Sequence, residues 1–500
     1  MDHQTTPLLT ALRRHAAEEP VQFHIPGHKK GRGADPEFRA FVGDNVLSID
    51  LINIAPLDDL HQPAGVIREA EALAADAFGA DDTLFSVQGT TGAIMTMIMA
   101  ACSPGDKIIL PRNAHKSILS AVIFAGALPV WVDPAKDRRL GIEHGVTMDS
   151  IREAVSLHPD AKAVLIINPT YYGTSIDLRQ AVEFIHSRGL LALVDEAHGT
   201  LLHCHERLPM SAMQAGADMA ASSVHKLGGS LTQSSVLNVK GGRVDIRRVR
   251  SFMSMLTTTS TSYILLASLD AARRQLALNG RALAEETIRL AVETRRQINE
   301  IPGLYCFGDE ICEQPGVFHY DPTKLCIHLE LGITGFAAEQ WLRETHNIEV
   351  ELSDLTNLLC LVTLGDTKRE TGLLIQALRH LSDTFFRPEA GSIAPNGASS
   401  PPVPGAVSLP AAGQFAMPPR EAFYALSESV ELLGSCGRTA AEFLYVYPPG
   451  IPIVMPGQTI TAEALDYIVK HLEAGLPVKG PEDPAVQRLR VVAAEEACLV

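Results

Sequence analysis

The sequence predicts an α/β fold, with a major domain built on a mostly parallel sheet, a small α/β domain and a C-terminal α+β domain. Two observations predict the α/β class and the mostly parallel sheet. Short apolar runs alternate with helical segments between residues 67 and 223, which is typical of parallel strands buried on both faces. Polar residues follow these runs directly, and ligands of α/β proteins bind at such strand ends.

Apolar spacing and turn residues place the individual elements. We expect helices over residues 7–18, 67–78, 94–101, 118–125, 211–215, 281–300 and 421–433. We expect strands over residues 107–111, 127–132, 163–167, 190–194 and 219–223, and a second α/β segment over residues 325–381.

Composition shifts suggest five parts of the chain. These are an N-terminal arm (1–60), a major domain (61–300), a small domain (301–386), a linker (387–416) and a C-terminal domain (417–500). The linker is dense in Pro, Gly, Ala and Ser, so we expect its residues 397–404 to be mobile. A chain of 500 residues also exceeds what one core usually supports.

Charge and cysteine usage exclude several classes of protein. The formal net charge is −16, which argues against a general nucleic-acid surface and is compatible with a cationic ligand. The eight cysteines form no C-x-x-C pair, and His203-Cys204-His205 is a lone cluster, so we expect reduced thiols and no metal site. Without a signal-peptide pattern or a long apolar run, we expect a cytoplasmic protein with no membrane partner.

The stretch Ser223-Val224-His225-Lys226 followed by Gly228-Gly229 is suited to pyridoxal 5'-phosphate (PLP). A lysine amine forms a Schiff base with the cofactor aldehyde, and the neighbouring hydroxyl and imidazole can donate to its phosphate. Alone, this stretch is weak evidence for a PLP site, because the same combination of residues also occurs by chance.

A second stretch, Gly89-Thr90-Thr91-Gly92, precedes an apolar helix. Glycines and small hydroxyl residues at a helix start offer unpaired backbone N–H groups and the positive end of the helix dipole, which suits a phosphate. It is not a Walker loop, because no Gly-Lys-Ser/Thr follows.

The motif Asp195-Glu196-Ala197-His198 ends a predicted strand. It matches the DEAH box of helicases, but that interpretation requires an upstream phosphate loop, which the sequence lacks. As a cofactor site it fits better. Asp195 can pair with the pyridine nitrogen, Ala197 is small enough to lie under a ring, and His198 can support both.

The sequence leaves open the role of the segment Phe23-His24-Ile25-Pro26-Gly27-His28-Lys29. Its Pro and Gly impose turns on a segment too rigid to be a tail. Packing on another subunit and a direct catalytic role both fit.

Together these motifs resemble the Orn/Lys/Arg decarboxylases, PLP enzymes of fold type I (the aspartate aminotransferase fold). The further motifs that carry the resemblance are Asn113-Ala114-His115-Lys116-Ser117, Asn168-Pro169-Thr170-Tyr171, Thr257-Thr258-Thr259-Ser260, Glu349-Val350-Glu351-Leu352-Ser353-Asp354 and Tyr447-Pro448-Pro449-Gly450-Ile451-Pro452. They cover nearly the whole chain. The pattern is most similar to the short arginine decarboxylases of bacterial polyamine synthesis.

The resemblance implies roles for individual residues. Lys226, His115 and Asp195 would be catalytic, with His115 stacked on the ring face. The cofactor would also contact Thr90, Thr91, Gly92, Ala197, His198, Ser223 and His225, and Thr259 or Ser260 from another subunit. Glu351 and Asp354 would meet a basic substrate, although a solvated acidic face explains them equally well. A shared site implies a homodimer or a higher homo-oligomer.

The resemblance therefore implies decarboxylation of arginine to agmatine and CO2 in polyamine synthesis. A lysine or ornithine decarboxylase on the same scaffold is the main alternative, and a transaminase or a non-catalytic PLP-binding protein is a weaker one. Many relatives have Pro-Gly-Glu where this chain has Pro456-Gly457-Gln458, a departure that bears on substrate choice.

Overall fold

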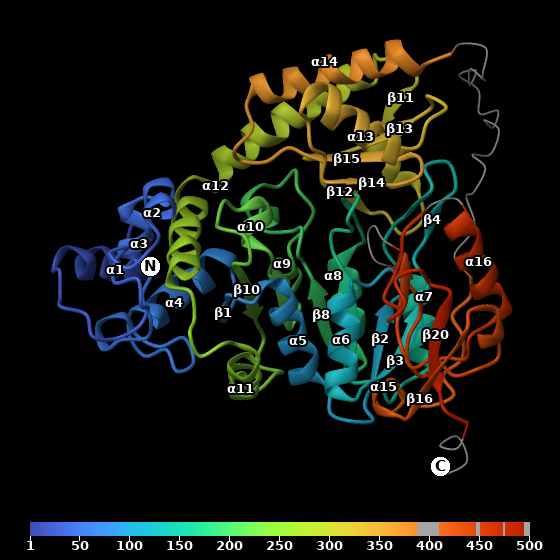
Figure 1. Ribbon diagram of the computed structural model, residues 1–500, viewed down its shortest axis with the longest axis horizontal. Coiled ribbons are helices and arrows are strands. Elements are labelled where there is room, and N and C mark those ends of the chain that lie inside the picture. Colours follow the sequence, from blue (N-terminus) through green and yellow to red (C-terminus); the bar gives the residue numbers. More distant parts are fainter. Residues whose placement is uncertain (388–409, 447–450, 474–475, 495–500) are drawn as a thin grey trace. The chain divides into compact units, whose positions relative to one another are not determined.

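A computed structural model describes residues 1–387, 410–446, 451–473 and 476–494 (Figure 1). The chain divides into two compact units. The first unit comprises Met1–Ala101, Leu165–Pro169 and Leu178–Glu286, and the second comprises Cys102–Val164, Thr170–Asp177 and Thr287–Val500. The five domain boundaries expected from composition stay a prediction.

The central sheet is mixed and mostly parallel, as expected. Its order is β1-β10-β9-β8-β6-β2-β3. The strands are β1 (Asp82–Ser86), β2 (Lys107–Pro111), β3 (Leu128–Val132), β6 (Ala163–Ile167), β8 (Leu191–Asp195), β9 (Met219–Ser222) and β10 (Ser235–Val239). Parallel pairing joins β8 to β9, and β2 to both β3 and β6. Only β10 runs against its neighbours, β1 and β9, among the pairings described.

Helices of the first unit cover its strands. Helix α5 (Gly89–Ala101) packs against β9 and β10, and α11 (Ile246–Leu256) packs on α5 (Figure 1). Helix α1 (Pro7–Ala17) packs on α4 (Val66–Phe78). The Asp58 carboxylate accepts the N–H groups of Gly65 and Ile67, which satisfies donors at the start of α4.

The second unit contains a separate antiparallel sheet of order β11-β13-β15-β14. Its strands are β11 (Leu304–Cys306), β13 (Lys324–Leu329), β14 (Leu352–Ser353) and β15 (Asn357–Leu361). Apolar side chains of this sheet share a core with α13 (Gly335–His346) and α14 (Lys368–Phe385). The α/β segment expected over residues 325–381 is thereby confirmed.

The C-terminal part is built around a second small core. Strand β16 (Ser427–Glu431) pairs with β20 (Arg488–Val492), and β17 (Leu444–Val446) pairs with β18 (Ile451–Val454) and β19 (Val478–Lys479). Helix α16 (Ala462–Glu473) contributes apolar side chains to the same core. The mobile stretch expected at 397–404 lies outside the described residues, as do residues 447–450 of the Pro-Pro-Gly motif.

Three expected helices differ from the structure. The helix expected from residue 94 begins at Gly89, so the small-residue stretch belongs to α5 itself. The helix expected from residue 281 is the end of α12 (Tyr263–Ile298), which is 36 residues long. The helix expected over 421–433 is wrong beyond Tyr424, where α15 (Pro419–Tyr424) ends, because the next residues pair with β20 instead.

No helix in the described ranges is long and apolar enough to cross a bilayer.

Candidate active site

Lys226 lies on a short helix, α10 (Val224–Leu227), directly after β9. Its Nζ lies 2.7 Å from Nε2 of His198, which follows β8. Because β8 and β9 are parallel neighbours, their carboxyl ends bring residues that are 28 positions apart in the sequence into hydrogen-bond contact. The sequence prediction that His198 and Lys226 belong to one site is consistent with this geometry.

Asp195 ends β8 and is 5% exposed. Its Oδ1 accepts the backbone N–H of Ala197 at 3.1 Å, and no other hydrogen bond to this carboxylate occurs among the described residues. Burial raises the pKa of Asp195, while the Ala197 N–H and the Lys226 amine oppose the rise. A cationic N–H donor placed beside the carboxylate would lower that pKa and restore its charge.

Glu196 is a buried partner that sequence reasoning left without a role. Its carboxylate accepts the N–H of Ala212 at 2.6 Å and the hydroxyl of Ser222 at 3.1 Å. Burial raises the pKa of Glu196 to about 8, and the neighbouring Asp195 adds to the rise. At neutral pH the carboxyl is therefore mostly protonated, which places no second negative charge beside Asp195.

Three buried hydroxyl groups meet at the start of α5. The Thr90 Oγ1 contacts the Ser223 Oγ and lies 2.8 Å from the Ser235 Oγ. Sequence reasoning named Thr90 and Ser223 but missed Ser235, which is 145 positions from Thr90. A small polar residue at the start of a buried strand was the available signal, but nothing local indicates its partner.

The backbone around Thr90 is shaped by two glycines. Gly89 has a φ of +68°, which glycine adopts without strain. A Cβ on Gly92 would lie 2.8 Å from Gln88 Cβ, so the first turn of α5 has no room for a side chain there. The Gly89 N–H donates to the Gln233 carbonyl and the Gly92 N–H to the Gln88 carbonyl, so the donors that this turn can offer beside the hydroxyl cluster are the N–H groups of Thr90 and Thr91.

The surroundings of His225 favour its neutral imidazole. Its Nδ1 lies 2.8 Å from the carbonyl oxygen of Ser234, so Nδ1 donates there. Burial lowers the pKa of His225. In the neutral ring Nε2 is then an acceptor, and the predicted donation from Nε2 to a phosphate requires the protonated imidazole.

Thr91, Thr259 and Ser260 are exposed, and the last two lie in the loop between α11 and α12.

His115 belongs to the second unit, where it is the exposed N-cap of α6 (Lys116–Ala125). Its Nδ1 accepts the N–H of Ser117 at 3.2 Å and lies 2.8 Å from the Ser117 hydroxyl. In a neutral ring this orientation places the proton on Nε2, because Nδ1 accepts the Ser117 N–H.

The two acidic residues expected to bind substrate differ in their environments. Glu351 is exposed and accepts the hydroxyl of Tyr171 at 2.7 Å. Asp354 accepts the hydroxyl of Tyr172 and the backbone N–H groups of Thr356 and Asn357. The Asn357 side-chain amide donates to it as well. Asp354 is therefore committed to its own loop, and Glu351 has more capacity for a further donor.

Gln458 is 3% exposed and uses both ends of its amide. Its Oε1 accepts the N–H of Met455 at 3.0 Å, and its Nε2 donates to the carbonyl of Gly413 at 3.1 Å. A carboxylate could not make the second bond, so glutamine serves the packing of this turn.

Comparison with known protein families gives two matches along the chain. The Orn/Lys/Arg decarboxylase major domain matches residues 6–370, and the C-terminal domain of the same family matches residues 408–477. The chain belongs to the Orn/Lys/Arg decarboxylase family. The resemblance read from the sequence motifs is confirmed.

Relatives match this chain over more than nine-tenths of its length. An arginine decarboxylase of Bacillus subtilis (strain 168) is 56% identical over 99% of this chain and 100% of its own length. An arginine decarboxylase of Bacillus anthracis is 58% identical over 97% of each chain. A lysine decarboxylase, LdcA of Pseudomonas aeruginosa, is 27% identical over 93% of this chain and 75% of its own length.

Solved structures of other decarboxylases confirm the fold. The lysine decarboxylase LdcF of Francisella novicida aligns with a TM-score of 0.83 at 22% identity, covering 97% of this chain and 80% of its own. The constitutive lysine decarboxylase of Escherichia coli aligns with a TM-score of 0.81 at 23% identity, covering 98% of this chain and 82% of its own. The expectation of a fold type I decarboxylase is confirmed at the level of the fold.

Proposed function

We propose that this chain decarboxylates L-arginine to agmatine and CO2 with PLP as its cofactor. The observation that carries the proposal is the identity of 56% and 58%, over almost the full length, to proteins named arginine decarboxylase. The lysine decarboxylase LdcA is only 27% identical, which favours arginine over lysine.

The residues of the first unit fit PLP. Lys226 offers an amine for the cofactor aldehyde, and Asp195 offers a buried carboxylate that can accept another donor. The hydroxyl cluster with Thr90 and Ser223, beside the first turn of α5, has the donors that a phosphate needs. When bound, PLP supplies the electron sink for the electron pair left on Cα as CO2 departs.

Each of these residues then has a defined task. Asp195 holds a proton at the pyridine nitrogen, because the buried carboxylate is stabilised by a cationic N–H. His198, 2.7 Å from the Lys226 amine, accepts or returns a proton there. Because Glu196 is protonated, Asp195 is the member of this carboxyl pair that carries a negative charge.

Two further assignments carry over from the resemblance to the family. We assign to His115 a place on the face of the cofactor ring, and to Thr259 or Ser260 a contact with the phosphate bound by a second copy. The second contact makes the protein at least a homodimer.

Substrate recognition falls mainly to Glu351 in this proposal. A guanidinium donates two parallel N–H groups, and a carboxylate with free acceptor capacity matches them. Glu351 is exposed and accepts the Tyr171 hydroxyl, whereas Asp354 is occupied by its own loop. Decarboxylation, rather than transamination, further requires that the Cα–carboxylate bond stand perpendicular to the ring.

The proposal places the protein in the cytoplasm, at the step of polyamine synthesis that forms agmatine. Reduced thiols fit that compartment, since none of the seven cysteines in the described ranges forms a disulfide.

The experiment compares the purified chain with Lys226→Ala and with Lys162→Ala, a change of an exposed lysine. With PLP and arginine, the parent and Lys162→Ala should release CO2 at the same rate and form agmatine. Lys226→Ala should lose at least about 1,000-fold in rate, as expected for loss of a covalent catalyst. Borohydride reduction should fix the cofactor to the Lys226 peptide alone. Turnover by Lys226→Ala at the parental rate would contradict the proposal.

A further inference from the structure

The loop between α11 and α12 presents three consecutive hydroxyl side chains to solvent. Thr258, Thr259 and Ser260 are all exposed, whereas Thr257 and Thr261 on either side of them are buried. The Thr258 Oγ1 accepts the N–H of Ser260 at 3.3 Å. The crest of the loop is thus polar and accessible, and its two flanks are anchored in the protein.

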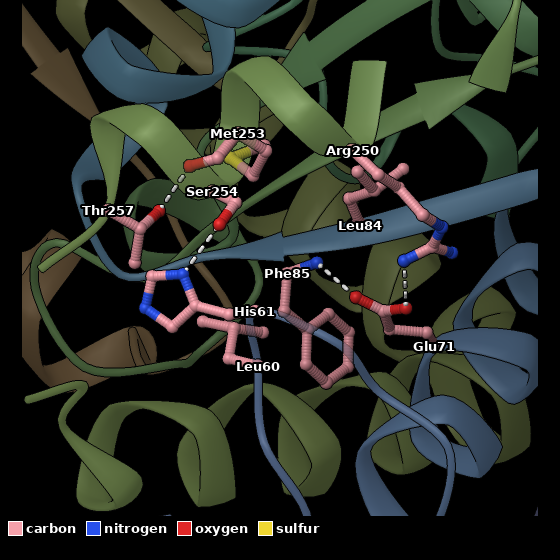
Figure 2. A pocket seen from close by; sticks show the side chains of 9 residues that line it. All are labelled: Leu60, His61, Glu71, Leu84, Phe85, Arg250, Met253, Ser254 and Thr257. Atoms are coloured by element: carbon pink, nitrogen blue, oxygen red, sulfur yellow. Dashed lines mark hydrogen bonds and ion pairs between the residues drawn. The ribbon is translucent and has the colours of Figure 1, made fainter. Parts of the chain in front are cut away.

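His61 holds the first flank of this loop. Its Nδ1 lies 2.7 Å from Oγ of Ser254 on α11, and its Nε2 lies 3.1 Å from the carbonyl oxygen of Thr258. A carbonyl oxygen only accepts, so Nε2 donates to it, and in the neutral ring Nδ1 accepts the Ser254 hydroxyl. Figure 2 shows the imidazole directed at Ser254.

Tyr263 holds the second flank. Its ring is fully buried, and its hydroxyl donates to the backbone carbonyl of Asp58 at 2.6 Å. Asp58 is itself fixed, since its carboxylate accepts N–H groups at the start of α4. Both flanks of the loop are therefore tied to one short segment, residues 58–61, that is anchored to α4.

The pocket around His61 contributes to this anchoring rather than offering a ligand site. Glu71 and Arg250 line it together with His61 and Ser254 (Figure 2). The Glu71 carboxylate accepts the N–H of Phe85 at 3.1 Å and the guanidinium of Arg250 at 3.1 Å. The polar groups of the lining are thus paired within the protein, His61 with Ser254 and Glu71 with Arg250.

We propose that His61 is a positioning residue that shapes the loop crest for the phosphate of PLP bound by a second copy of this chain. The inference rests on the proposed function, in which Thr259 or Ser260 makes that contact. Ordering a free loop residue costs conformational entropy. A loop that His61 and Tyr263 already hold avoids much of that cost when the phosphate binds.

The first test measures how fast PLP leaves the full-length holoenzyme after dilution. His61→Ala should release PLP about tenfold faster than the parent, because both links to the loop flank are lost. His61→Gln retains an N–H near the Thr258 carbonyl and should stay within about threefold of the parent. The matched control is His186→Ala, since His186 bonds Asp218 at 2.8 Å in the same unit and does not bond to the loop.

A mixed-subunit test shows whether the loop acts on the other copy. In a co-expressed mixture of His61→Ala and Lys226→Ala chains, a mixed dimer has one site with an intact lysine and an intact partner loop. Those sites should release PLP at the parental rate, although the His61→Ala chain alone does not.

Three results overturn the inference: parental release by His61→Ala, equal acceleration by His186→Ala, or no slow sites in the mixture. A parent protein that binds no PLP at all overturns the proposed function instead, so the two failures are distinguishable.

Discussion

Replacement of Glu196 by glutamine should change how stability depends on pH. The carboxyl has a pKa of about 8 in the folded protein and an ordinary value of 4.5. Between these values the folded state keeps a proton that the unfolded state releases. The contribution of Glu196 is therefore fully present below pH 4.5 and is lost as the pH rises through about 8.

The size of the effect follows from the two pKa values. Each pH unit within the window costs the folded state about 1.4 kcal/mol, which gives about 4 kcal/mol between pH 5 and pH 8. Glutamine does not titrate, accepts the Ala212 N–H through Oε1 and can donate to the Ser222 hydroxyl through Nε2. The free energy of unfolding of Glu196→Gln, minus that of the parent, should grow by this amount over the window.

Urea unfolding of the cofactor-free protein at pH 5, 6, 7 and 8 measures the difference. Glu69→Gln, a change on the exposed side of α4, is the matched control and should follow the parent at every pH. If Glu196→Gln and the parent lose stability in parallel from pH 5 to pH 8, the reasoning about the buried carboxyl is refuted.

Other positions give shorter tests. Thr90→Val should weaken PLP affinity about tenfold, whereas Thr90→Ser should stay close to the parent, as measured by PLP titration. Asp195→Asn should lower kcat at least about 100-fold while the cofactor stays attached to the lysine, as measured by steady-state rates and absorbance. Glu351→Gln should raise the KM for arginine about tenfold with little change in kcat, whereas Asp354→Asn should mainly lower Tm, because its carboxylate holds a loop. Equal KM effects of the last two variants would contradict the distinction between them.

Local sequence predicted five of the seven strands of the central sheet and missed β1 and β10. The strands expected at residues 107–111 and 163–167 match β2 and β6 residue for residue. Each is a short apolar run between turn residues, so its limits are encoded locally. The helix predicted over 421–433 failed, because its second half pairs with β20 about 60 residues later, and local spacing carries no information on such a partner.

In the candidate site, too, local features were predictable from the sequence and long-range contacts were not. The individual stretches around Lys226, Asp195 and Thr90 were recognisable, because each combines reactive or small polar residues at a strand or helix end. The contacts between them were not, since Thr90 meets Ser223 across 133 positions and Lys226 meets His198 across 28. The protonated state of Glu196 was also hidden, because it depends on burial that only the folded chain creates.

The most direct test of the central claim supplies arginine, lysine and ornithine in parallel to the purified protein with added PLP. Released CO2 is measured, and each amine product is identified. The account predicts CO2 and agmatine from arginine, at a kcat/KM at least about 100-fold above the values for the other two amino acids. Cadaverine or putrescine as the main product would contradict arginine as the substrate, and no CO2 from any of the three would contradict decarboxylation itself.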